Sequence, residues 1–165
     1  MCIRDSYTVA KFNKAVWSLN HLKKARISPD VLVRIYCTML RPIIEFCSVV
    51  YHPMLTIEMS NDLERLQKMS LKIIHGFGIE YEELLRKSNL KTLEHRRTEA
   101  FKKFSNAVVL NERYESWFPT NVETSHDLRH RKRYCEFYAR TNRLYNSPLY
   151  AMRRALNSED INYDE

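Results

Sequence analysis

The sequence predicts an all-α fold: an irregular helical bundle with a proline-kinked central helix and an extended, basic carboxyl-terminal segment. Apolar residues recur at helical spacing through most of the chain, which indicates helices that each bury one face. Among the 165 residues there are only two glycines, and neither Asn-Gly nor Asp-Gly occurs. A β-hairpin fold would need such dipeptides between alternating strands. A chain of this length can bury roughly 70% of its unfolded surface and so hold one core.

The central helix has the clearest periodicity. Ser28 suits the amino-terminal cap, and Pro29 suits the first helical position. Pro42 lacks an amide hydrogen and its ring collides with the preceding turn, so we expect two half-helices that share an apolar face and end at Pro53. That face comprises Leu32, Ile35, Tyr36, Met39, Leu40, Ile43, Phe46, Cys47 and Val50.

Helices are also predicted on either side of this segment. The first covers residues 8–25, with Thr8 as its cap. The next begins at Thr56 or Ser60 and stops at the two glycines, because glycine takes a left-handed backbone at no steric cost. The expected inward faces are Val9, Phe12, Val16 and Leu19 in the first helix, and Met59, Leu63, Leu66, Ser70 and Ile73 in the other.

The second half of the chain divides at Pro119. Before it, a short helix covers residues 81–86, and Thr92 caps a longer helix that turns Leu93, Ala100, Phe101, Phe104 and Val108 inward. After it, aliphatic residues become sparse and we expect an exposed, extended segment. The predicted division is a leader at 1–6, a helical bundle at 7–118, a basic extended segment at 119–148, a short terminal helix at 149–157 and an acidic tail at 158–165.

Cysteine spacing and hydropathy exclude two classes of site. Cys2, Cys37, Cys47 and Cys135 are too far apart in the sequence for the close ligand pairs typical of zinc sites. We interpret Cys37 and Cys47 as small buried residues of a protein in a reducing, intracellular compartment. The sequence does not distinguish the nucleus from the cytoplasm. No apolar run approaches the ~18 residues that would cross a bilayer, so we expect no membrane partner.

The net charge of +7 favours a polyanionic partner. The basic residues are concentrated in residues 126–154, which contain only two acids, Asp127 and Glu136. Guanidinium groups can form bidentate hydrogen bonds to phosphate oxygens, and aromatic rings can stack on bases. The alternative is a solvated loop whose tyrosines pack back onto the helices. The predicted nucleic-acid-binding residues are Arg129, Arg131, Lys132, Arg133, Tyr134, Tyr138, Arg140, Arg143 and Tyr145, with Phe137 among them.

A second basic patch lies at the end of the first predicted helix. It consists of Lys23, Lys24 and Arg26. These side chains either bind nucleic acid or balance the partial negative charge of the helix carboxyl end. The sequence alone favours neither interpretation.

Four sequence segments carry a resemblance to a known family. They are ISPDVLVRIYCTMLRPIIEFCSVVY at 27–51, DLERLQKMSLKIIHGFG at 62–78, EYEELLRKSNLKTLEHRRTEAFKKF at 80–104 and RHRKRYCEFYARTNRLYNSPLYAMRRALN at 129–157. Their order resembles the region after the catalytic palm in reverse transcriptases of non-long-terminal-repeat retrotransposons, of the jockey-like and long-interspersed-element type. The resemblance spans residues 9–157. It implies the thumb and post-palm part of an RNA-directed DNA polymerase, with RNA, DNA or an RNA–DNA hybrid and the remainder of the polymerase as partners.

The resemblance implies no catalytic residue in this chain. Nucleotidyl transfer needs paired carboxylates that hold two metal ions. Members of the family present them as an Asp-Asp pair, which the sequence lacks. We therefore expect no enzyme activity from the chain alone and no cofactor in it, with Mg²⁺ bound only by the palm. The alternative function is a stand-alone helical module that binds a protein through an exposed apolar face.

The first six residues, MCIRDS, are not expected to belong to the fold. They resemble a translation artefact that recurs at the ends of proteins predicted from assembled reads. We therefore expect a non-native leader and a larger protein upstream.

Overall fold

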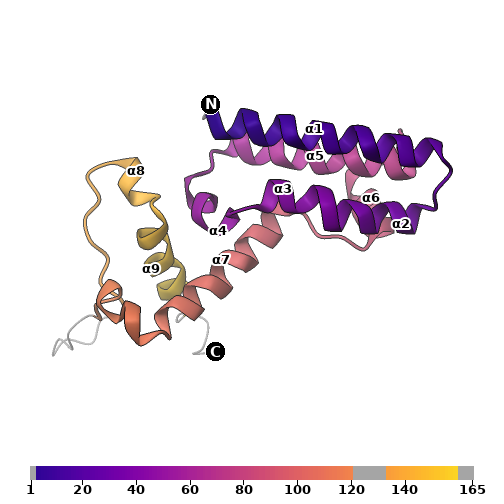
Figure 1. Cartoon of the computed structure of the whole chain (residues 1–165). Helices are drawn as coiled ribbons and strands as arrows, with labels where there is room; N and C mark the ends of the chain where they lie inside the picture. Colours follow the sequence, from indigo (N-terminus) through magenta and orange to yellow (C-terminus); the bar gives the residue numbers. More distant parts are fainter. Residues whose placement is uncertain (1–2, 121–132, 160–165) are drawn as a thin grey trace. The chain divides into compact units, whose positions relative to one another are not determined.

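The computed structural model describes residues 3–120 and 133–159, with side chains from 8 to 120 and from 133 to 158 (Figure 1). Every regular element in these ranges is a helix, which confirms the predicted all-α fold. One isolated antiparallel bridge joins Thr120 and Tyr134. None of the described helices is long and apolar enough to cross a bilayer.

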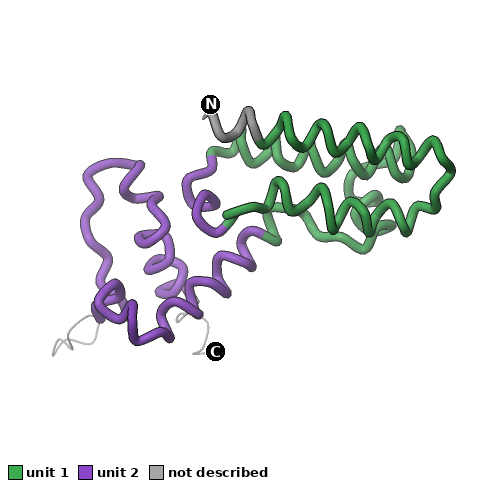
Figure 2. Tube along the Cα trace, viewed as in Figure 1, with its two compact units in different colours: residues 1–48, 56–96 green, residues 49–55, 97–165 purple. Residues whose placement is uncertain are grey.

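The chain forms two compact units, where the sequence had suggested a single bundle over residues 7–118 (Figure 2). Unit 1 comprises Met1–Ser48 and Thr56–Arg96, and unit 2 comprises Val49–Leu55 and Arg97–Glu165. A periodic apolar pattern marks the buried face of each helix, but it does not show which helices share a core. Each unit has its own cluster of buried apolar side chains.

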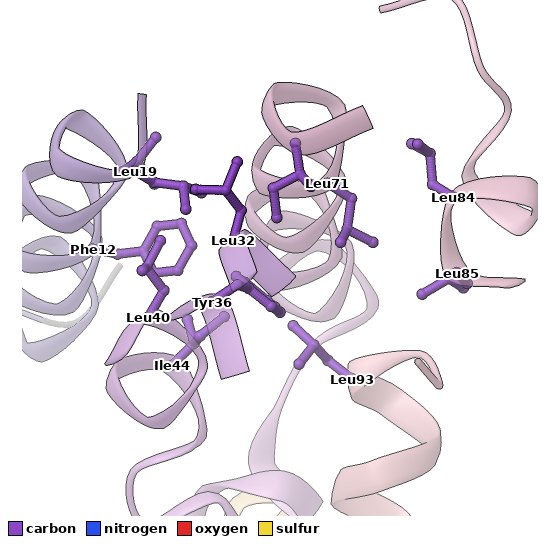
Figure 3. Close-up of a cluster of buried hydrophobic side chains, with 12 residues drawn as sticks. Phe12, Leu19, Leu32, Tyr36, Leu40, Ile44, Leu71, Leu84, Leu85 and Leu93 are labelled. Atoms are coloured by element: carbon purple, nitrogen blue, oxygen red, sulfur yellow. The ribbon is translucent and has the colours of Figure 1, made fainter. Parts of the chain in front are cut away.

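Unit 1 packs its helices around a core drawn from all of them. The elements are α1 (Ile3–Lys24), α2 (Pro29–Ile35), the π-helix η1 (Tyr36–Leu40), α3 (Arg41–Glu45), α5 (Ile57–His75), α6 (Tyr81–Ser88) and the first turn of α7 (Leu93–Val109). Helix α1 contacts α5 and α3, and α5 contacts α6 (Figure 1). Figure 3 shows the buried side chains converging from these helices. They are Phe12, Val16, Leu19, Leu32, Tyr36, Leu40, Ile44, Leu71, Ile74, Leu84, Leu85 and Leu93.

The expected break at Pro42 is present as a π-helical turn. The amide of Arg41 donates to the carbonyl of Tyr36, five residues earlier, so the turn before Pro42 is wider than an α-helical one. The second half is shorter than predicted, because it ends at Glu45 and not at Pro53. Cys47 has a left-handed backbone (φ 57°) and is exposed, which corrects its expected burial in the central helix. The segments that follow are α4 (Ser48–Tyr51) and the 3₁₀-helix η2 (His52–Met54).

Two helices of unit 1 end in Schellman motifs. After α1 the amide of Arg26 donates to the Lys23 carbonyl at 3.0 Å, and the amide of Ile27 donates to the Leu22 carbonyl at 3.4 Å. Arg26 therefore takes the left-handed position (φ 60°) that glycine usually occupies. The same motif ends α6, where Asn89 (φ 51°) takes that position.

Several predicted helix boundaries are found in the structure. Thr56 accepts the amide of Met59 at 3.2 Å and so caps α5, and Thr92 caps α7 through the amide of His95 at 3.2 Å. Helix α5 stops at Gly76 (φ 112°), as predicted. Helix α1 begins at Ile3, so the prediction of Thr8 as its cap was wrong.

The buried face of α5 is rotated from the predicted one. Ser70 is buried as expected, but Met59, Leu63, Leu66 and Ile73 are only partly buried. The fully buried positions include Gln67, which is 0% exposed. A polar residue lies on this face because its amide group is hydrogen-bonded there, so the apolar pattern alone misplaces the centre of the face.

Gln67 links three parts of unit 1. Its Oε1 accepts the hydroxyl of Tyr36 at 2.7 Å, and its Nε2 donates to the hydroxyl oxygen of Tyr81 at 2.9 Å and to the carbonyl of Lys91 at 3.1 Å. The Tyr81 hydroxyl in turn donates to Glu64. Burial raises the pKa of Tyr36 far above the ordinary tyrosine value, so its hydroxyl remains a hydrogen-bond donor at physiological pH. The network therefore fixes the register of α5 against η1 and α6.

Two charged contacts hold the first turn of α7 within unit 1. The Oε1 of Glu64 accepts the amide of Glu94 at 2.8 Å, in the first turn of α7, where a carboxylate complements the helix dipole. Glu45 binds the Nε of Arg96 through Oε1 at 2.6 Å and lies 3.5 Å from the Nε of Arg41 through Oε2. The predicted ion pair of Arg41 with Glu45 is thus present, and hydrogen bonding to Glu45 raises the pKa of Arg96.

Unit 2 has a smaller core. Its elements are α4 from Val49 onward, η2, the remainder of α7, the 3₁₀-helix η3 (Glu112–Trp117), α8 (Asn142–Tyr145) and α9 (Pro148–Glu159). Phe104 is 43% exposed, so its predicted inward position is wrong. Helix α9 occurs where the short terminal helix was expected. The buried apolar residues are Phe101, Phe118, Tyr134, Ala151, Met152 and Leu156.

Candidate nucleic-acid interface

The described part of the basic segment is anchored by Tyr134. Its ring is 5% exposed and meets the ring of Phe118 edge-on, with centroids 5.9 Å apart. The side chain of Asn157 pairs with the Tyr134 backbone, accepting its amide at 2.9 Å and donating to its carbonyl at 3.1 Å. Tyr134 was predicted to stack on a base, and that assignment needs correction because its ring is part of the unit 2 core.

Arg153 holds the next residues against α9. It is 4% exposed, and its Nε donates to the carbonyl of Trp117 at 3.0 Å. The guanidinium carbon lies 4.5 Å from the centroid of the Phe137 ring. A buried guanidinium needs such acceptors and ring faces to replace water. Arg153 therefore positions the backbone near Phe137 and contributes to structure more than to the surface.

The other large aromatic side chains and the arginines of the segment, up to Tyr145, are exposed. Tyr138 is 87% exposed, Phe137 is 52% exposed and Tyr145 is 50% exposed. Arg133, Arg140 and Arg143 are exposed as well. We refer to this surface as the arginine-aromatic segment, defined as Arg133, Phe137, Tyr138, Arg140, Arg143 and Tyr145.

The carboxyl-terminal half of this surface is built on α8. Thr141 caps the helix by accepting the amide of Leu144 at 3.2 Å, which places Arg143 and Tyr145 on one short turn. Arg154 lies with its guanidinium carbon 3.7 Å from the Tyr145 centroid and donates to the Tyr145 carbonyl at 2.6 Å. One face of the Tyr145 ring is thus covered by a cation, and half of the side chain remains exposed.

The local charge is strongly positive. Between residues 133 and 158 the sequence holds five arginines and one acid, Glu136. The Glu136 carboxylate accepts the side-chain amide of Asn157 at 3.0 Å. Because the sequence holds only one acid along this stretch, the exposed guanidinium groups of Arg140 and Arg143 can bind an anionic ligand. Arg129, Arg131 and Lys132, also predicted to bind, lie outside the described residues.

The patch at the end of α1 is divided between two roles. The Nζ of Lys23 donates to the carbonyl of Ile74 at 2.6 Å, in the last turn of α5. Lys23 therefore satisfies the carboxyl end of a neighbouring helix, α5, whereas the electrostatic alternative concerned the end of its own helix. Lys24 and Arg26 are exposed and stay candidates for binding.

Two further findings bear on the chemistry of the chain. The described residues contain no group of three or more His, Cys, Asp or Glu side chains that could hold a metal ion. Comparisons of the chain with models of protein families, with curated proteins and with solved structures found no match.

Proposed function

We propose that this chain is the nucleic-acid-binding, non-catalytic part of an RNA-directed DNA polymerase of a non-long-terminal-repeat retrotransposon. The observation that supports binding is the arginine-aromatic segment, where three exposed arginines are interspersed with three exposed aromatic rings. The polymerase assignment rests on the four sequence segments that resemble the family. In this proposal the catalytic carboxylates and their Mg²⁺ ions belong to a palm outside this chain.

The arrangement suits a ligand with both phosphates and accessible bases. Guanidinium groups bind phosphate oxygens bidentately, and each stacked base contributes about 1–3 kcal/mol. Tyr138 is the best placed ring, because 87% of it is open to solvent. Neither interaction reads base identity, so we expect binding with little sequence preference, to RNA–DNA hybrids and to single strands.

The test is a binding titration with an RNA–DNA hybrid and with a single strand across a salt series. Each arginine that contacts a phosphate contributes roughly 0.9 to the slope of log affinity against log salt on a duplex. Arg140→Gln and Arg143→Gln should each reduce this slope, whereas Lys103→Gln, an exposed charge on α7, should leave it unchanged. A salt-independent affinity, or equal slopes for all three variants, would contradict the proposal.

The absence of catalysis is tested separately. Primer extension by the isolated chain, with Mg²⁺ or Mn²⁺, should yield no product. Metal-dependent DNA synthesis would require carboxylates within this chain and would overturn the assignment to a non-catalytic part.

A second candidate function is a helical module that binds a protein. It is favoured by large apolar side chains that are unusually exposed, namely Ile57 at 84%, Leu110 at 83%, Phe77 at 80% and Phe46 at 76%. Apolar docking depends little on salt, so the titration that tests nucleic-acid binding also separates the two functions. A flat salt response together with tight binding to a protein partner would favour this candidate.

A further inference from the structure

The outward face of α1 presents a tryptophan to solvent. Trp17 is 65% exposed, although tryptophan side chains are highly buried on average. It borders an open hollow on the surface of unit 1, lined by Ala10, Asn13, Lys14, Trp17 and Ser18.

The indole of Trp17 is held in a defined position. The imidazole of His21, one turn later, lies with its centroid 3.8 Å from that of the indole at an interplanar angle of 40°. The Nδ1 of His21 lies 3.0 Å from the Trp17 carbonyl oxygen, which orients the imidazole. Since His21 covers one side of the indole and most of the side chain is exposed, the ring offers a preformed aromatic surface.

Among the described side chains of this helix, which begin at Thr8, charge is of one sign. From Thr8 to Arg26 the sequence contains no Asp or Glu. Lys14 and Lys24 are exposed, and among the described side chains neither forms an ion pair. Lys14 precedes Trp17 by three residues and Lys24 follows it by seven, so both lie on the Trp17 side of the helix. A rise of about 1.5 Å per residue places them roughly 5 and 10 Å from Trp17 along the axis, on opposite sides of the ring.

A cationic helix with a tryptophan could also lie on a membrane surface, but the packing of α1 disfavours this. Interfacial helices insert a broad apolar face into the lipid. The apolar face of α1 is occupied, since Phe12 and Leu19 are 0% exposed and Val16 is 5% exposed in the unit 1 core (Figure 3). What remains outside is one aromatic ring among Asn13, Lys14 and polar neighbours, which matches a base and its phosphates.

We propose that α1 is a second contact for single-stranded nucleic acid, in which an unpaired base stacks on Trp17 while adjacent phosphates bind Lys14 and Lys24. This contact lies in unit 1 and is separate from the arginine-aromatic segment of unit 2, and it rests on the proposed function as a nucleic-acid-binding chain. Stacking requires an accessible base face, so the contact selects single strands over blunt duplexes.

Fluorescence tests the contact directly, because the chain has only two tryptophans. In a Trp117→Phe variant Trp17 is the sole tryptophan, and titration with oligo(dT) or oligo(U) should quench its emission to saturation. A blunt duplex of equal length should leave the emission nearly unchanged. Quenching by the duplex alone, or a response to anionic phosphatidylserine vesicles in place of oligonucleotides, would overturn the proposal.

Affinity measurements supply the second test. Trp17→Ala should weaken oligo(dT) binding by about 5- to 150-fold, the range for loss of one stacked base, and Trp17→Phe should retain most of the affinity. Met39→Ala, at a position 64% exposed in the same unit, should bind like the unsubstituted chain. If Trp17→Ala binds normally while Tyr138→Ala does not, this contact is wrong and the proposed function stands. If the unsubstituted chain binds no oligonucleotide, both are wrong.

Discussion

Replacement of Gln67 by leucine should destabilise unit 1, although it puts an apolar residue into a buried site. Gln67 is 0% exposed and accepts the hydroxyl of Tyr36, itself 0% exposed. Gln67→Leu leaves the Tyr36 hydroxyl without its hydrogen-bond acceptor, because leucine accepts no hydrogen bond. A buried donor without a partner costs about 1–3 kcal/mol, while Tyr81 keeps its bond to Glu64. We expect a loss of about 2 kcal/mol in the free energy of unfolding.

A second substitution should recover part of that loss. When Tyr36 also loses its hydroxyl, the penalty for that unsatisfied donor disappears. Tyr36→Phe in the Gln67→Leu background should therefore restore about 1 kcal/mol, although Tyr36→Phe alone destabilises the protein. The assay is urea unfolding followed by far-UV circular dichroism and by Trp17 fluorescence in a Trp117→Phe background, since Trp17 lies in unit 1.

The control for this cycle is on the same helix. Met69→Leu, at a position 49% exposed in α5, should change stability by less than about 0.5 kcal/mol. If Gln67→Leu is neutral, or if adding Tyr36→Phe makes the double variant less stable still, the hydrogen bond between these side chains does not hold α5 in register.

Three other predictions concern stability. Arg26→Gly should stabilise the chain by about 1 kcal/mol in urea titrations, because it relieves the left-handed backbone, whereas Arg26→Ala should give no such gain. Glu45→Gln removes the paired contact with Arg96, whose side chain is 37% exposed, and should cost no more than about 1 kcal/mol, a difference that high salt reduces. Burial, reinforced by Lys23, lowers the pKa of His75 below its ordinary 6.5, so the unfolded chain binds that proton first as pH falls. The contribution of His75 to the free energy of unfolding should thus be fully present above about pH 6.5 and decline below it. His75→Gln should remove this part of the decline when unfolding is measured between about pH 7.5 and 5.5.

Local signals in the sequence predicted the helices well. Thr56 and Thr92 cap helices by hydrogen bonds to residues three positions later, and Gly76 ends the helix that directly precedes it. These helix boundaries could therefore be identified without knowledge of the fold. Gln67 could not be identified in this way. Its burial depends on Tyr36 and on residues 14 and 24 positions later, and the sequence alone does not reveal that they meet.

The same limit applies to the candidate interface. Composition assigned Tyr134 and Tyr138 the same role, yet one is 5% exposed and the other 87% exposed. The segment has no helical or strand period from which facing could be inferred, and Asn157, 23 residues away, fixes the backbone of Tyr134. Similarly, Arg153 lies in the same basic stretch of the sequence but is 4% exposed, and its guanidinium group donates to the carbonyl of Trp117.

The difference between buried and exposed arginines has a measurable consequence for the salt dependence of affinity. Within the arginine-aromatic segment, the arginines that can release counterions are the exposed ones, Arg133, Arg140 and Arg143. At roughly 0.9 per phosphate contact, these three account for a slope of about −2.7 on a duplex. Arg153→Gln should destabilise unit 2, while the protein that remains folded should keep the same slope of log affinity against log salt. Arg140→Gln should leave the stability unchanged and reduce that slope. A slope that falls equally for both would mean that burial does not separate the structural from the binding arginines.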